Sequence, residues 1–117
     1  MRASCLAAPL VILALLPPGR ADAPKLSLPK VLPMTKLGPA KLMPHLCLLR
    51  YRIGTTSPEC QAYFDQGLGF FYSYVWMEAA RSFETATQYD PNCAMAWCAL
   101  SKAIERWGRG QHAPAMK

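Results

Sequence analysis

The chain has 117 residues, which is enough for at most one small domain. Its formal net charge is +6, and 52% of its residues are hydrophobic. The basic excess is concentrated in residues 24–55, which contain Lys and Arg but no Asp or Glu. Such a segment could contact nucleic acid or anionic lipid. No nucleic-acid-binding motif accompanies it, so we expect a solvated basic segment and no nucleic-acid partner.

The N-terminal segment, residues 1–23, has the pattern of a secretory signal peptide. Arg2 provides a positive charge, and the apolar run over residues 5–16 is too short to cross a bilayer as a helix. Residues 21–23 are Ala-Asp-Ala, which matches an A-x-A cleavage site. We expect a protein that is exported to the periplasm or the cell exterior, is cleaved after Ala23, and touches the membrane only through this segment. The alternative is a buried N-terminal helix.

Residues 24–56 are predicted to form an extended, Pro-rich leader. Over residues 24–44, prolines recur every four to six positions between Lys and Leu. Each proline removes a backbone donor and biases the preceding residue away from helix, so we expect a linker here. Residues 45–56 mix apolar and β-favouring residues around Gly54. We expect this second part to be an extended segment that packs on the helices after it.

A helical domain is predicted over residues 57–117, so the expected fold class is all-α. Ser57 is a good cap, Pro58 suits the first helical position and Glu59 favours the positive helix end. The first helix is expected to run from there to about Tyr74. Apolar residues at helical spacing then predict two further helices, over about 76–89 and 93–107.

The first two predicted helices carry small and aromatic residues at fixed spacing. These positions are Tyr63, Gly67, Phe70, Ala79, Phe83, Ala86 and Pro91, with Gln66 where a Leu is expected. The pattern resembles a tetratricopeptide repeat, which has a period of about 34 residues. Small residues such as Gly67 and Ala79 would let the two helices approach each other closely. A shift by one such period gives Trp97 and Leu100, which also suit their positions.

The resemblance is to exported bacterial tetratricopeptide proteins, and it implies an antiparallel helix-turn-helix solenoid fragment of three helices. Repeat one covers about residues 60–93, and a partial repeat two covers about 94–117. Because repeats bury their faces against neighbours, Leu100, Ile104 and Trp107 are expected to lack a partner helix. A truncated chain, self-association through the unfinished repeat, or a cover from residues 46–51 would each explain this.

The same resemblance implies a concave groove that is lined by the first helix of each repeat. The residues carried over to it are Gln61, Phe64, Leu68, Phe71, Tyr72, Met95, Lys102 and Glu105. We expect this groove to bind a protein or an extended peptide, or the chain's own residues 46–51. The alternative is that Phe64, Leu68 and Phe71 are simply core residues that the chain itself covers.

The chain after the predicted cleavage site keeps four cysteines, Cys47, Cys60, Cys93 and Cys98. An even number in an exported protein favours disulfides over reactive thiols. Sequence alone does not choose among the three connectivities, but Cys47 and Cys60 flank a loop and are the preferred pair. Cys93 and Cys98 would lie on different parts of one helix surface, which is an awkward geometry for a bridge.

No arrangement of a nucleophile, a base and an oxyanion site is found in the sequence. It also lacks zinc-type Cys spacing and a Gly-rich phosphate loop. We therefore expect no enzymatic activity, no cofactor and no metal, and the leading hypothesis is an exported, non-catalytic scaffold or adaptor. The alternatives are a redox or metal-carrying protein that uses the four cysteines, and an inert fragment of a longer repeat protein.

Overall fold

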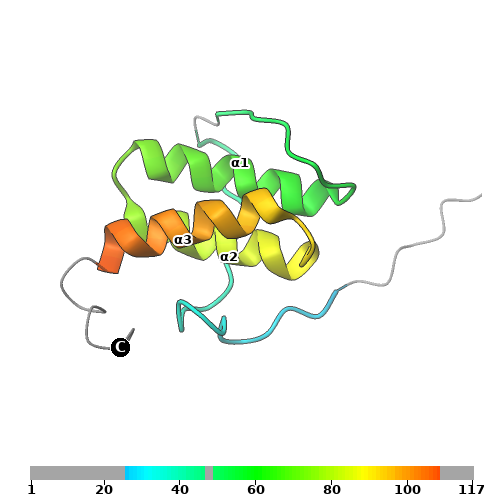
Figure 1. Ribbon diagram of the computed structural model, residues 1–117, viewed down its shortest axis with the longest axis horizontal. Helices are drawn as coiled ribbons and strands as arrows, with labels where there is room; N and C mark the ends of the chain where they lie inside the picture. Colours follow the sequence, from blue (N-terminus) through cyan, green and yellow to red (C-terminus); the bar gives the residue numbers. More distant parts are fainter. Residues whose placement is uncertain (1–25, 47–48, 109–117) are drawn as a thin grey trace, which may run out of the picture.

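The computed structural model describes residues 26–46 and 49–108. These ranges contain three helices, α1 (Pro58–Tyr72), α2 (Trp76–Tyr89) and α3 (Ala94–Gly108), and no strand. The expected all-α class is therefore confirmed for the described part of the chain. α1 and α2 form a hairpin, and α3 packs against α2 (Figure 1). The predicted signal peptide and the end of the second repeat lie outside the described residues.

The start of α1 has the cap that the sequence predicts. Ser57 Oγ accepts a hydrogen bond from the backbone N–H of Cys60 at 3.1 Å, and Pro58 is the first helical residue.

None of the three helices in the described ranges combines the length and the apolar character that a membrane span requires.

The end of α1 lies at Tyr72, slightly earlier than the sequence predicts. Tyr74 N donates to Phe71 O at 3.2 Å, and Val75 N donates to Phe70 O at 2.9 Å. Tyr74 adopts a left-handed backbone conformation, with φ of 65°. These two bonds form a Schellman cap with Tyr at the position that Gly usually occupies. The cap reverses the chain and starts α2 immediately afterwards.

α1 and α2 approach each other closely because Gly67 has no side chain. The ring of Phe83 fills the space, and a Cβ added to Gly67 would lie 2.5 Å from Phe83 Cε1. Phe64 packs on the same ring, with centroids 5.4 Å apart. Ala79 and Ala86 are fully buried on α2. The predicted close approach is thus present, and the side chain that contacts Gly67 is Phe83.

α3 contributes its small and branched residues to the same core. Ala96, Leu100 and Ala103 are all fully buried, and α3 packs against α2. The prediction that Leu100 lacks a partner is therefore wrong, because this side chain points into the core shared with the hairpin. Ile104 and Trp107, for which the sequence predicts no cover, are partly buried and pack against that core.

The turn between α2 and α3 is held by polar contacts. Asp90 Oδ1 accepts from Asn92 N at 3.1 Å, and the indole N–H of Trp97 donates to Pro91 O at 2.7 Å. Trp97 remains 38% exposed. Pro91 thus ends the hairpin, as predicted, and its carbonyl orients the exposed indole.

The first part of the leader packs on α2 instead of forming a linker without contacts to the helices. Leu32 is fully buried. The carboxylate of Glu84, also fully buried, accepts hydrogen bonds from Met34 N at 2.6 Å and Thr35 N at 2.8 Å. The expectation of a linker over residues 24–44 is corrected by these contacts, which hold its described part on the helices.

The leader then crosses from α2 to α1 through further backbone contacts. Thr85 Oγ1 accepts from Ala40 N at 2.9 Å. The side-chain amide of Gln66 accepts from Met43 N at 2.8 Å and donates to Lys41 O at 3.0 Å. Polar side chains of the hairpin therefore pair with the leader's backbone, and one of them is Gln66, at the position where the sequence analysis expects Leu.

Candidate functional site

An apolar groove of about 370 Å³ is formed by residues of α1, α2 and α3. Its lining residues are Phe64, Leu68, Phe71, Tyr72, Phe83, Met95, Cys98, Ala99 and Lys102. Six of the eight residues that the sequence assigns to a groove therefore meet here: Phe64, Leu68, Phe71, Tyr72, Met95 and Lys102. The structure brings these residues together from α1 and α3, which are separated in the sequence by the whole of α2.

The groove has a buried floor and an exposed rim. Phe64 is 2% exposed and Phe83 is 1% exposed, so both rings belong to the core and form the floor. Tyr72 is 66% exposed, and Met95 is 44% exposed. Phe64 is thus a core residue, as the alternative interpretation of the sequence has it, while the rim residues are open to solvent.

Aromatic contacts hold one of the lining side chains, Phe71, in place. Its ring makes edge contacts with Tyr72 and Trp76, with centroids 5.7 Å and 5.1 Å apart. It also packs on Phe83 at 6.4 Å. A ring with three aromatic neighbours loses little further freedom when a ligand binds. The groove is therefore preorganised at Phe71.

Lys102 is the charged side chain among the lining residues, and it is exposed. Met95, Cys98, Ala99 and Lys102 follow helical spacing, so they lie along one side of α3. This places a cationic group at one end of an apolar stripe. The groove can accept apolar side chains along its length and a negative group near Lys102.

The leader does not line this groove in the part of the chain that the structure describes. The sequence makes residues 46–51 a candidate occupant. Instead, Tyr51 N donates to Asp65 Oδ1 at 3.1 Å, and Tyr51 O accepts from Gln61 Nε2 at 2.8 Å. Both partners belong to a different side of α1, so the described leader leaves the groove open.

Gln61 and Glu105 do not lie in the groove, and their predicted places are corrected. Gln61 Oε1 accepts from Ile53 N at 3.0 Å, and its Nε2 also donates to Asp65 Oδ1 at 2.9 Å. The side chain is thus used to hold the leader. Glu105 is exposed on α3, outside the residues that line the groove.

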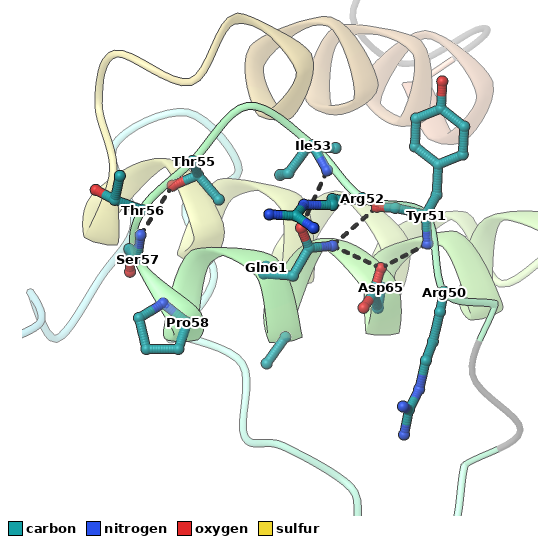
Figure 2. Close-up of a pocket in the computed structure, with 11 residues that line it drawn as sticks. Arg50, Tyr51, Arg52, Ile53, Thr55, Thr56, Ser57, Pro58, Gln61 and Asp65 are labelled. Carbon is teal, nitrogen blue, oxygen red and sulfur yellow. Dashed lines mark hydrogen bonds between the residues drawn. The ribbon is translucent and has the colours of Figure 1, made fainter.

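A second hollow, of about 660 Å³, lies where the leader runs along the start of α1. Figure 2 shows the amide of Gln61 between the backbones of Tyr51 and Ile53, with Asp65 beside it. The exposed side chains of Arg50 and Arg52 extend from the leader. The polar groups at the base of this hollow already bind the backbone of the leader. The hollow is therefore part of the contact between the leader and α1.

A cluster of the buried Cys60 and Cys93 with the partly buried Asp90 lies at the start of α1 and α3, with their ligand-type atoms all within 4.8 Å of one another. Burial raises the pKa of the Cys60 thiol to about 11, although a hydrogen bond with Thr55 opposes the shift. Cys98 is exposed. Cys47 lies outside the described residues, so the preferred Cys47–Cys60 pairing stays a prediction.

Sequence reasoning missed the contact between Cys60 and Cys93. A signal was present in the sequence, because Cys60 lies near the predicted start of the first helix and Cys93 near the predicted start of the third. Comparison of the chain with protein-family models, with curated proteins and with solved structures finds no match in any of the three. Function is therefore inferred from the groove and the contacts of this chain.

Proposed function

We propose that this protein is an exported, non-catalytic interaction module whose groove binds an extended peptide with apolar side chains and an acidic group. The observation that carries the proposal is the convergence of six expected side chains on one apolar groove that the described leader leaves open. Exposed apolar surface that is gathered in one concave place commonly marks a binding site.

The tetratricopeptide arrangement is part of this proposal. It is supported by the packing of Phe83 on Gly67, by the buried Ala79 and Ala86, and by the turn at Pro91. In this arrangement the first helices of successive repeats, α1 and α3, form the concave surface. The groove between them is then the surface on which such repeats hold peptides.

The chemistry of the groove determines the ligand class. Leu68, Phe71 and Met95 offer apolar contacts, and the flexible thioether of Met95 adapts to different side chains. Lys102 favours a carboxylate, from Asp, Glu or a chain terminus. The ligand is therefore expected to gain affinity from two or three apolar side chains, with the acidic group selecting its orientation.

Fluorescence polarisation with designed peptides tests the proposal. The probe is a labelled peptide with Leu, Phe and Asp residues, and two matched peptides replace Asp by Lys or the apolar residues by Ser. We expect the first peptide to bind the purified protein, the Lys peptide to bind more weakly, and the Ser peptide not to bind. Equal binding of all three peptides, or none, would contradict the proposal.

Matched substitutions locate the binding. Tyr72→Ser is expected to weaken binding of the first peptide, whereas Tyr51→Ser, which removes a similarly exposed tyrosine from the leader, is expected to have no effect. Lys102→Glu is expected to weaken binding about 3- to 5-fold, since an exposed ion pair contributes up to about 1 kcal/mol. Lys30→Glu makes the same charge change on the leader and is the control.

A further inference from the structure

Cys60 and Cys93 are held near each other by the cap of α1 and by the turn that precedes α3. Cys60 N donates to Ser57 Oγ at 3.1 Å, and Cys93 N donates to Asp90 O at 3.2 Å. Both side chains are buried, with exposures of 0% and 2%. Their sulfur atoms belong to a cluster whose members all lie within 4.8 Å of one another.

We propose that Cys60 and Cys93 form a disulfide bond that ties the start of α1 to the start of α3. A disulfide requires sulfur atoms about 2.05 Å apart and Cβ vectors that converge. In the structure both cysteines are free thiols with sulfur atoms within 4.8 Å of each other, so the two sulfur atoms must approach further for the bond to form.

The bond forms by exchange with a disulfide oxidant, either a small-molecule disulfide or a disulfide oxidoreductase. The thiol of one cysteine loses its proton, and the thiolate attacks a sulfur of the oxidant, so that a mixed disulfide forms and one oxidant thiolate leaves. The second cysteine then loses its proton, attacks the mixed disulfide and expels the other oxidant thiolate. The protein loses two protons and two electrons, and the oxidant disulfide becomes two thiols.

Burial affects when this exchange can take place. Because desolvation raises the pKa of the Cys60 thiol, the folded protein holds little thiolate at neutral pH. The exchange is therefore faster while the chain folds or opens locally than in the closed structure. Once formed, the bond is shielded from reductants by the same burial.

A metal ion fits the cluster less well than a disulfide. Structural zinc usually has four protein ligands, whereas this cluster offers three donors. Both oxygens of Asp90 also accept hydrogen bonds, Oδ1 from Asn92 N and Oδ2 from Thr55 Oγ1. Withdrawing Asp90 from these contacts would release the turn before α3 and the end of the leader.

The disulfide would affect the groove, because it joins the two helices that form its walls. The loop that it closes, residues 60–93, contains the rest of α1 and all of α2. The disulfide rests on the proposed function in one respect only: export would place the protein in an oxidising compartment. Peptide binding is measurable on the reduced protein, so failure of the disulfide and failure of the groove are distinguishable.

Peptide mapping without reduction tests the bond. Trypsin cleavage after Arg52 and Arg81 places Cys60 in the peptide 53–81, and Cys93 with Cys98 in the peptide 82–102. The oxidised protein, alkylated in denaturant before digestion, is expected to yield these two peptides as one covalent pair that separates on reduction. The same pair is expected from the Cys98→Ser variant.

Three results would overturn the inference. The first is alkylated Cys60 in the oxidised protein, and the second is Cys60 joined to the peptide that contains Cys47. The third is one equivalent of zinc in elemental analysis, together with free thiols at Cys60 and Cys93.

Urea unfolding with and without a thiol reductant gives a second readout. Reduction is expected to lower the midpoint for the wild type and for Cys98→Ser by the same amount, and to leave Cys93→Ser unchanged. Equal responses of the wild type and Cys93→Ser would contradict the bond.

Discussion

The two sides of the α1–α2 hairpin differ in the chemistry of the side chains that they present. The side that the leader covers carries buried polar groups, such as Gln66, Glu84 and Thr85, each bonded to leader backbone. The side that faces α3 carries Phe64, Phe71 and other apolar groups, and it ends in an open groove. The side that binds the leader is thus polar, and the side that faces α3 and the groove is apolar.

This difference follows from what each side binds. An extended backbone brings N–H and C=O groups that must keep hydrogen-bond partners when they leave water, so the hairpin meets the leader with carboxylate, amide and hydroxyl groups. A helix satisfies its own backbone, so α3 needs only small and apolar neighbours. The open groove continues the second kind of surface, which is why its expected ligand binds through side chains.

The largest effect is expected from breaking the leader side at Glu84. Glu84→Ala leaves Met34 N and Thr35 N without their acceptor, and it is expected to lower the free energy of unfolding by about 2–3 kcal/mol. Thermal unfolding followed by circular dichroism measures this. Glu78→Ala, which removes a partly buried carboxylate that pairs with Arg81 on α2, is the control and is expected to change stability by less than about 1 kcal/mol. Equal losses in both variants would contradict the anchoring role.

Gly67→Ala tests the contact that supports both sides. Ala is a better helix former than Gly by about 1 kcal/mol, but its Cβ would overlap the Phe83 ring. The net expectation is a loss of about 1–3 kcal/mol, as in other overpacked cores. Gly54→Ala meets no atom within 4 Å and is expected to be close to neutral. A stabilised Gly67→Ala variant would show that the two helices are not in close contact there.

A rise in pH tests the contribution of the Cys60 thiol to stability independently of the two sides of the hairpin. The pKa of Cys60 is raised to about 11 in the folded, reduced protein from an ordinary value of 9.0. The neutral thiol therefore contributes stability that is fully present below about pH 9 and is lost as pH rises through about 11. The loss is on the order of 2 kcal/mol. Urea unfolding of reduced wild type and of Cys60→Ser checks this, since only the wild type should lose this contribution.

The smallest effect is expected at the turn that ends α1. Tyr74 has a left-handed backbone, which costs a residue other than Gly about 1 kcal/mol. Tyr74→Gly is expected to raise the free energy of unfolding by up to about 1 kcal/mol, reduced by the loss of the ring contact with Trp76. A destabilised variant would indicate that the ring contact matters more than the backbone conformation. Peptide affinity should stay unchanged, because Tyr74 does not line the groove.

The parts of the fold that local sequence encodes are predictable. Ser57 and Pro58 mark a helix start through cap chemistry, and the predicted range of α2 matches the observed helix. The end of α1 is predicted too late, because a Tyr in a left-handed conformation gives no Gly signal there. Six of the eight residues that the sequence analysis assigns to a groove share one face, because helical spacing encodes faces of helices.

The contacts of the leader cannot be predicted in the same way. Prolines identify an extended chain, but nothing local shows which surface it will follow. The available signal is the polar residues at interior positions, such as Gln66 in place of Leu and Glu84 directly after Phe83. A buried polar side chain requires a partner, and here the partner is 23 to 50 residues away in sequence. The misplacement of Gln61 has the same cause.

The central claim, that the apolar side of the hairpin is the binding side, is tested most directly by amide chemical-shift mapping. The purified, isotope-labelled protein is titrated with the Leu-, Phe- and Asp-containing peptide. The expected result is saturable shifts at Leu68, Phe71, Met95 and Lys102, with the amides of Thr35, Ala40 and Ile53 on the leader side unchanged. Shifts confined to the leader side, or an unchanged groove at saturating peptide, would contradict the account.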